Sequence, residues 1–443
     1  MKTKKILSMI LASSLSIALL AGCGGAKNNT SSSNAGDGAA TEDAIKGEIT
    51  VLTNRTDLVD NLMLDYAAEF NKVYPDVKVS FEAMVDYPGE VKIRMNTEEY
   101  GDVLLIPNDI SLDELGNFFE PLGTVDELSS KYKFVTEKAF DGTVYGIPTY
   151  VTAKGLVYNK KVFEEAGITE IPATPEDFIK ALQMIKDNTE SIPYYTNYAA
   201  GWPLGGQWED NGLSIAGDEN WQNTLPHNDA PWAKGEPYYV LSKLLYDMVD
   251  LGLVEEDPTT SDWEGSKAML NKGEIACMLL GSWSITQMQE AGEFPDDIGY
   301  MPFPYTNADG NVYSNSGGDY KIGINKYSKN KAAAEAWLTW FVEESNFTKD
   351  AGGIPVMVGA PLPENLKAFD DLGVKLIGSL PAPAGEETYL DDIDNEAEIG
   401  RWSESYRQRI VEAALGNNKE SLEDIMTDLN TKWAAAKETL GIK

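Results

Sequence analysis

The sequence predicts an α/β fold built on a parallel sheet. Residues 47–53 alternate apolar and polar side chains as a strand does, and apolar residues then recur at helical spacing over 59–73. Residues 77–81 alternate again, and 102–107 form a continuous apolar run that suits a strand buried on both faces. A strand, a helix and two further strands in this order favour a parallel arrangement.

The same pattern resumes downstream. Thr174 precedes Pro175 and is followed three residues later by an acid, which is the signature of a capped helix N-terminus. Further strands are expected over 155–159, 276–280 and 321–325, and helices over 178–185, 333–341, 402–413 and 422–433.

The first 22 residues read as an export signal. Basic residues precede an almost uncharged run, 6–21, that is shorter than the ~20 residues of a bilayer span. Leu20-Ala21-Gly22-Cys23 resembles the bacterial lipobox, which implies cleavage before Cys23 and a lipid on its sulfur. Residues 23–45 carry almost no large apolar side chain, so we expect a disordered tether there and a folded region from residue 46.

The net charge argues against nucleic-acid binding, and the cysteine content argues against a disulfide. The chain carries 36 Lys and Arg against 71 Asp and Glu, a formal net charge of −35, which would repel nucleic acid phosphates. With Cys23 lipidated, Cys277 has no cysteine to pair with, and its apolar surroundings predict a buried, inert thiol. About 400 folded residues are enough for two lobes.

Three groups of motifs resemble the extracellular solute-binding proteins of the maltodextrin-binding type, the sugar-binding components of ABC importers. They occur in the family's order and span most of the chain from residue 47. The motifs are Tyr145-Gly146-Ile147-Pro148 with 155–168; Gly273-Glu274-Ile275-Ala276-Cys277-Met278 with Gly281-Ser282-Trp283 and 298–304; and Gly317-Gly318-Asp319 with 321–324 and 328–331.

The resemblance implies a two-lobed periplasmic-binding-protein type II fold with the ligand cleft between the lobes. Lobe 1 would comprise residues 46–152 and 318–360, and lobe 2 residues 153–317 and 361–443. It further implies a monomer without cofactor or metal, which delivers a carbohydrate, expected to be an oligosaccharide, to the permease subunits of an ABC importer. The lipid on Cys23 would hold it at the outer face of the bacterial membrane.

Sugars present apolar faces and rims of hydroxyls, so their sites combine aromatic platforms with polar side chains. Trp283 follows a buried strand and a glycine, where similar proteins place a stacking tryptophan. For the other aromatic candidates a core or helix-packing role is equally open. These candidates are Trp202, Trp208, Trp263 and Trp402, with Asn197 and Tyr198 as neighbouring polar contacts.

The polar candidates lie in loops that face the cleft in similar proteins. Asn54, Arg55 and Asp57 follow the first strand, although Asp57 could instead cap the next helix. Asn108 and Asp109 follow the buried run 102–107. Tyr150 lies on the first segment that crosses between the lobes, and Asp319 follows two glycines that allow close approach of a ligand.

Rival functions find less support. A secreted glycoside hydrolase needs paired carboxylates, but no acidic spacing stands out among 71 candidates. His227 is the only histidine and shows no nucleophile signature, so neither a catalytic triad nor a zinc site is expected, and we predict that the chain is not an enzyme. The same binding role with a polyamine or a peptide as ligand remains an alternative.

Overall fold

A computed structural model describes residues 45–56, 58–84, 87–107 and 110–443. The predicted signal peptide, Cys23 and all but the last residue of the predicted tether lie outside these residues. Among the helices that the structure describes, none is both long and apolar enough to cross a bilayer. We use the names lobe 1 and lobe 2 for the residue ranges proposed above.

A mixed sheet runs through both lobes in the order β2-β1-β3-β11-β7-β9-β8, with β10 added beside β7 and β12 beside β11. Its strands are β1 (Gly47–Thr53), β2 (Val77–Ala83), β3 (Val103–Leu105), β7 (Ile147–Asn159), β8 (Ile192–Tyr194), β9 (Ile275–Gly281), β10 (Ile298–Pro302), β11 (Tyr313–Ile324) and β12 (Lys375–Ile377). A small second sheet holds β4 (Gly123–Thr124), β6 (Thr143–Val144) and β5 (Ala139–Phe140).

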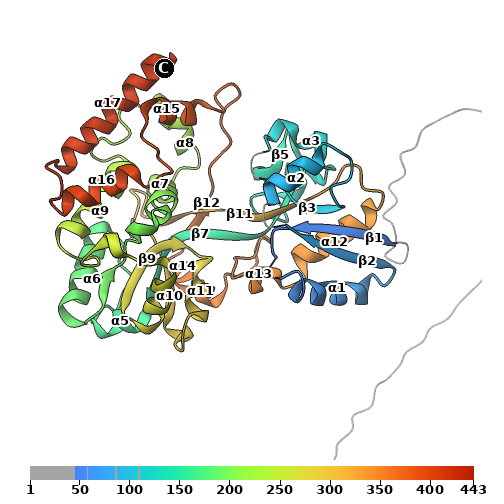
Figure 1. Ribbon diagram of the computed structural model, residues 1–443, viewed down its shortest axis with the longest axis horizontal. Coiled ribbons are helices and arrows are strands. Elements are labelled where there is room, and N and C mark those ends of the chain that lie inside the picture. Colours follow the sequence, from blue (N-terminus) through green and yellow to red (C-terminus); the bar gives the residue numbers. More distant parts are fainter. Residues whose placement is uncertain (1–44, 57, 85–86, 108–109) are drawn as a thin grey trace, which may run out of the picture. The chain divides into compact units, whose positions relative to one another are not determined.

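The prediction of a parallel sheet is only half right. β1 pairs in parallel with β2 and β3, as expected, but β11 pairs antiparallel with both β3 and β7, and β7 pairs antiparallel with β9. The long strands β7 and β11 lie side by side in opposite directions and pass from one lobe into the other (Figure 1). Proline and glycine are unfavourable inside strands, and Pro148 and the glycines at 317 and 318 lie in these two. The sequence pattern therefore predicted only one end of each strand.

The helices follow the chain through both lobes. Lobe 1 contains α1 (Leu62–Val73), α2 (Tyr87–Met95), α3 (Leu115–Phe118), α4 (Val125–Leu128), α12 (Lys331–Glu343) and α13 (Phe347–Asp350). Lobe 2 contains α5 (Lys160–Glu165), α6 (Pro175–Asn188), α7 (Trp208–Ala216), α8 (Trp221–Thr224), α9 (Pro237–Asp250), α10 (Trp263–Lys272), α11 (Ser284–Glu290), α14 (Lys367–Asp371), α15 (Tyr389–Ala397), α16 (Ser405–Ala414) and α17 (Leu422–Leu440).

Local chemistry explains why these helices start where they do. The Thr174 hydroxyl accepts the backbone N–H of Asp177 at 3.1 Å, and Pro175 is the first helical residue of α6, as predicted. Ser421 and Asp424 form a reciprocal capping box at the start of α17. The helix predicted over 402–413 begins only at Ser405, so Trp402 stands in the loop before it.

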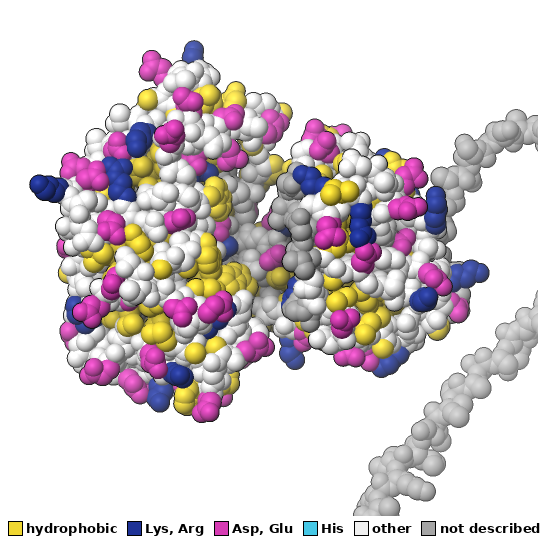
Figure 2. Space-filling model, viewed as in Figure 1, with side chains coloured by type: hydrophobic (Ala, Val, Ile, Leu, Met, Phe, Trp, Pro, Cys, Tyr) yellow, Lys and Arg dark blue, Asp and Glu magenta, His cyan; other side chains and the backbone are white. Residues whose placement is uncertain are grey.

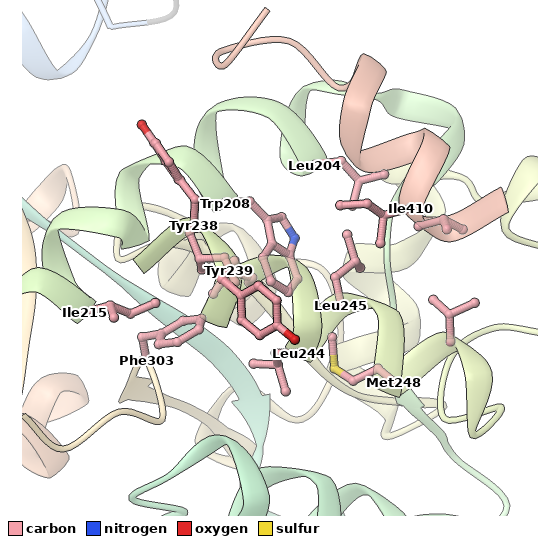
Figure 3. Packing of buried hydrophobic residues seen from close by; sticks show 14 of the residues in the cluster. Leu204, Trp208, Ile215, Tyr238, Tyr239, Leu244, Leu245, Met248, Phe303 and Ile410 are labelled. Atoms are coloured by element: carbon pink, nitrogen blue, oxygen red, sulfur yellow. The ribbon is translucent and has the colours of Figure 1, made fainter. Parts of the chain in front are cut away.

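Each lobe packs around its own aromatic residues. In lobe 1, Trp337 and Trp340 are buried on α12 and pack against Phe70 of α1. In lobe 2, a cluster from α7, α9 and α16 surrounds Trp208, with Leu245 and Ile410 around its ring (Figure 3). Cys277 is buried on β9, and burial raises the pKa of its thiol, as expected of an inert cysteine.

Candidate ligand-binding site

Three tryptophans from separate segments of lobe 2 form one aromatic cluster. The ring centroids of Trp202 and Trp263 lie 5.1 Å apart at 86°, and those of Trp202 and Trp283 lie 5.9 Å apart at 41°. The third pair, Trp263 and Trp283, lies at 6.2 Å. Trp202 remains 38% exposed, and the other two are half-buried. We call these three residues the tryptophan cluster; it offers open ring faces of the kind that stack on sugars.

Local geometry fixes the ring of each member. Trp283 is the residue before α11. A Cβ at position 281 would lie 2.5 Å from its indole nitrogen, so only Gly281 lets the ring lie back over the end of β9. Trp263 opens α10, and the Lys267 ammonium lies 4.8 Å from its ring centroid. Trp202 precedes a π-helical turn, Pro203–Gln207, of the kind often found at functional sites.

Trp402 stands beside the same turn. It is 49% exposed, and a Cβ on Gly205 would meet its carbonyl oxygen at 2.5 Å, so the two segments touch through their backbones. Its ring lies near Gly206. The structure therefore brings Trp202 and Trp402 to one surface from positions 200 residues apart in the chain.

A buried ionic network supports this surface from below. The Arg407 guanidinium donates to Glu209 Oε2 at 2.8 Å, to the Arg401 carbonyl at 2.8 Å and to the Gly205 carbonyl at 3.3 Å. Arg401 lies 3.6 Å from the other Glu209 oxygen, which also accepts the Tyr238 hydroxyl. All of these side chains are buried. This network could not be predicted from the sequence, because no local pattern links Glu209 to the two arginines.

Polar side chains line the crossing strands. Tyr150 of β7 faces Asp319 of β11 in register, and burial, followed by the Asp319 carboxylate, raises the pKa of the Tyr150 phenol. Lys154 pairs with Asp210 at 2.7 Å; burial raises the pKa of Asp210, and the lysine opposes that rise. Lys154 lies on the same crossing strand as Tyr150, and no local pattern in the sequence links it to Asp210.

The loop after β8 carries Asn197 in a left-handed conformation with φ 57°. Its side chain is buried, its Nδ2 lies 3.2 Å from the Met278 sulfur, and its Oδ1 finds no donor among the described residues. The buried Glu255 carboxylate holds the loop by accepting the Thr196 backbone N–H and hydroxyl. Asn197 as a ligand contact stays a prediction, because its unsatisfied oxygen is buried in this structure.

On the lobe 1 side, Asn54 and Arg55 follow β1, as expected for residues at the end of a parallel strand. Asn54 is exposed, and Arg55 lies close enough to Tyr66 and Tyr150 to oppose the rise in the pKa of both phenols. Three predicted residues lie outside those that the structure describes, namely Asp57, Asn108 and Asp109.

One predicted contact needs correction, and a second has a partner within the lobe. Trp208 is only 2% exposed and lies in the lobe 2 core against Tyr194, so its ring offers no face to a ligand (Figure 3). The cause is its position as the first residue of α7, whose apolar side faces that core. Tyr198 is half-buried, and its hydroxyl already donates to Glu412 of α16 at 2.7 Å, so its first role is to fasten the loop.

A broad groove of about 1500 Å³ lies elsewhere, beside residues 352–372, and none of the tryptophans of the site lines it. Its walls include Tyr158, Gly299 and Val356. Volume alone does not make a sugar site, because recognition needs flat rings and hydroxyl partners together. We therefore place the candidate site at the tryptophan cluster.

Residues 56–346 match the family described as bacterial extracellular solute-binding protein. Among solved structures, a manno-oligosaccharide-specific solute-binding protein of Bifidobacterium animalis subsp. lactis, in complex with mannotriose, is 37% identical with a TM-score of 0.74, over 90% of this chain and 96% of that one. An ABC transporter binding protein of the same organism, in complex with mannobiose, is 38% identical with a TM-score of 0.73 over the same shares.

Two more distant relatives match part of the chain. The maltotriose-binding protein of Pyrococcus abyssi is 23% identical over 304 residues, covering 66% of this chain and 62% of that protein. An uncharacterized extracellular-binding protein of Pyrococcus horikoshii is 29% identical, with 38% of each chain aligned. The match along residues 56–346 and the two-lobed architecture agree with the resemblance inferred from the motifs. This chain belongs to the bacterial extracellular solute-binding protein family.

Proposed function

We propose that the chain is an extracytoplasmic receptor that captures an oligosaccharide and delivers it to an ABC importer. The tryptophan cluster is the observation that carries this proposal. Its three partly exposed rings, with centroids no more than 6.2 Å apart, suit the apolar faces of successive sugar units. The two solved relatives near 37% identity hold mannotriose and mannobiose, so a manno-oligosaccharide is the ligand to test first.

Capture would proceed by closure of one lobe on the other. The tryptophan cluster belongs to lobe 2, whereas Asn54 and Arg55 belong to lobe 1, so a ligand that contacts both sets stabilises the closed form through its additional contacts. The crossing strands β7 and β11 are the elements about which such a motion would occur. The family and its relatives are binding proteins, and we propose no catalysis.

The remaining parts of the proposal concern the membrane and the partners. A lipid on Cys23 would tether the receptor to the outer face of the membrane, where it would meet the permease subunits as a monomer. A Cys23→Ser chain should then appear in the culture medium rather than in the membrane fraction. Retention of that variant in the membrane would refute the anchor without affecting the proposal about sugar binding.

Calorimetric titration of the chain from Ala44 onward tests the binding role directly. Mannotriose should bind saturably, and Trp283→Ala should weaken it about threefold to tenfold, the equivalent of about 0.5–1.5 kcal/mol for one lost stacking contact. Phe294→Ala is the matched control: that ring is 46% exposed in the same lobe but belongs to no part of the cluster.

Three outcomes would overturn the proposal or one of its parts. Binding of spermidine or of a peptide pool in place of every sugar would move the ligand to another class. Equal weakening by Trp283→Ala and Phe294→Ala would show that the tryptophan cluster is not where the sugar lies. Cleavage of the oligosaccharide during the titration would revive a glycoside hydrolase.

A further inference from the structure

A second, smaller pocket lies on the side of Trp402 that faces α15. Its volume is about 270 Å³, and its lining includes Asn223, Glu386, Leu390, Asp391, Arg401 and Trp402. Complete ligand pockets usually begin near 300 Å³ and run to about 1000 Å³, so this one has room for a single ring-sized group. None of the three residues of the tryptophan cluster lines it.

The walls of the pocket are held by hydrogen bonds between segments that are distant in sequence. Asn223 donates to the Pro381 carbonyl at 3.0 Å, and the Leu380 backbone N–H donates to the Glu219 carbonyl at 2.9 Å. His227 lies within hydrogen-bonding distance of Glu386, at 2.9 Å. A ligand entering this pocket therefore meets walls that are already ordered, which lowers the entropic cost of binding.

One buried polar group on the pocket lining is unsatisfied. Arg401 is 1% exposed, and its Nε–H finds no acceptor among the described residues, although the rest of its guanidinium lies near Glu209 and Tyr238. A buried donor without a partner is unusual and costly in a folded protein. A ligand hydroxyl, or a water that it holds, would supply the missing acceptor.

The surrounding chemistry limits which group can enter. The Trp402 ring is half exposed and offers an apolar face, while three carboxylates line the pocket, those of Glu386, Glu387 and Asp391. These carboxylates would repel an anion and accept hydrogen bonds from hydroxyls. An apolar ring face and several acceptors together match a neutral sugar unit.

We propose that this pocket is an outer subsite that receives one neutral hexosyl unit of an oligosaccharide whose main part lies on the tryptophan cluster. The inference rests on the proposed function. Trp402 is the link, because it lines the pocket and also touches the turn that follows Trp202. The receptor would therefore select longer or branched ligands over a disaccharide.

Two alanines of one loop allow a matched test. Ala382 lines the pocket and Ala384 does not, and both are exposed. The chain from Ala44 onward, Ala382→Phe and Ala384→Phe are titrated with mannobiose, mannotriose and a longer manno-oligosaccharide. The unsubstituted chain should bind the longest ligand about threefold to tenfold more tightly than mannobiose, as one additional stacking contact provides.

Ala382→Phe should abolish this gain and leave mannobiose affinity within about twofold, since the pocket and the cluster are separate sites. The unchanged mannobiose affinity also reports that the variant is folded. Ala384→Phe should behave as the unsubstituted chain does. A gain that survives Ala382→Phe, or no gain with length, overturns the subsite.

The remaining outcomes separate this inference from the function on which it rests. Tighter binding of an oligosaccharide that ends in a hexuronate would overturn the assignment of a neutral unit while keeping the subsite. Absence of binding to every sugar tested would overturn the proposed function and, with it, the proposed subsite.

Discussion

Replacement of Arg407 by methionine should destabilise lobe 2 by about 3–5 kcal/mol, the usual cost of breaking a buried ion pair from one side. Methionine keeps an unbranched apolar stem but removes the charge and every donor. Glu209 would lose its contact at 2.8 Å and keep Arg401 only at 3.6 Å. The carbonyls of Gly205 and Arg401 would lose their donor at the same time.

Arg409→Met is the control on the same helix. Arg409 pairs with Glu420 and Asp428 at 2.5 and 2.6 Å, but its side chain is 28% exposed and its partners are more so. Because solvent screens such exposed pairs, each contributes only about 0–1 kcal/mol to the free energy of unfolding. Urea unfolding of both variants, followed by far-ultraviolet circular dichroism, should therefore shift the midpoint strongly for Arg407→Met and little for Arg409→Met.

A second readout separates stability from positioning. Because Arg407 binds the carbonyls next to Trp402 and behind Trp202, mannotriose affinity should fall in Arg407→Met under conditions where the variant is still folded. Equal midpoint shifts in the two variants would refute the reasoning on stability. A large shift with unchanged affinity would show that the network supports the core and not the platform.

Two further expectations follow from local geometry. Gly281→Ala would place a Cβ 2.5 Å from the Trp283 indole nitrogen, so it should weaken mannotriose binding by tilting that ring while leaving the fold intact; unchanged affinity would contradict the assignment. Hydrogen bonds to the Lys443 carbonyl and then to Glu386 raise the pKa of His227, so this contact contributes stability below about pH 6.5 that is lost as pH rises through the raised pKa. Proton NMR of the single histidine should show that raised pKa, and Glu386→Gln should lower it in part; a value at or below 6.5 would contradict the contact.

Local signals predicted most of the elements but not their pairing. β1, the Thr174 cap of α6 and the stripe of α12 follow from side chains within a few residues of one another. The antiparallel pairing of β7 with β11 joins segments more than 150 residues apart, and the glycines of β11 argue locally against a strand. Only the register of the folded sheet shows that these residues are extended.

The candidate site was likewise predictable only where the signal is local. Trp202 and Trp208 lie six residues apart in one glycine-rich stretch, and their neighbours in sequence give no reason to separate them. The structure separates them by the direction that each faces: Trp208 begins α7 and points into the core, while Trp202 precedes the π-helical turn and stays partly exposed. Trp263 and Trp283 are placed beside it by α10 and α11, which no short-range pattern connects.

The buried network of Arg407, Glu209 and Arg401 explains how exposed aromatic rings can be held in fixed positions. Rings that bind a ligand must be exposed and therefore stand on loops, yet a platform works only if its rings stay where the ligand needs them. Arg407 meets both demands, because one guanidinium holds the backbone beside Trp402 and the backbone of the turn after Trp202 from beneath the surface. Charge is needed for this because a fully buried guanidinium with Glu209 as its counterion presents several donors in fixed directions, which no apolar side chain offers. The network therefore explains how two exposed rings on separate loops can keep one geometry.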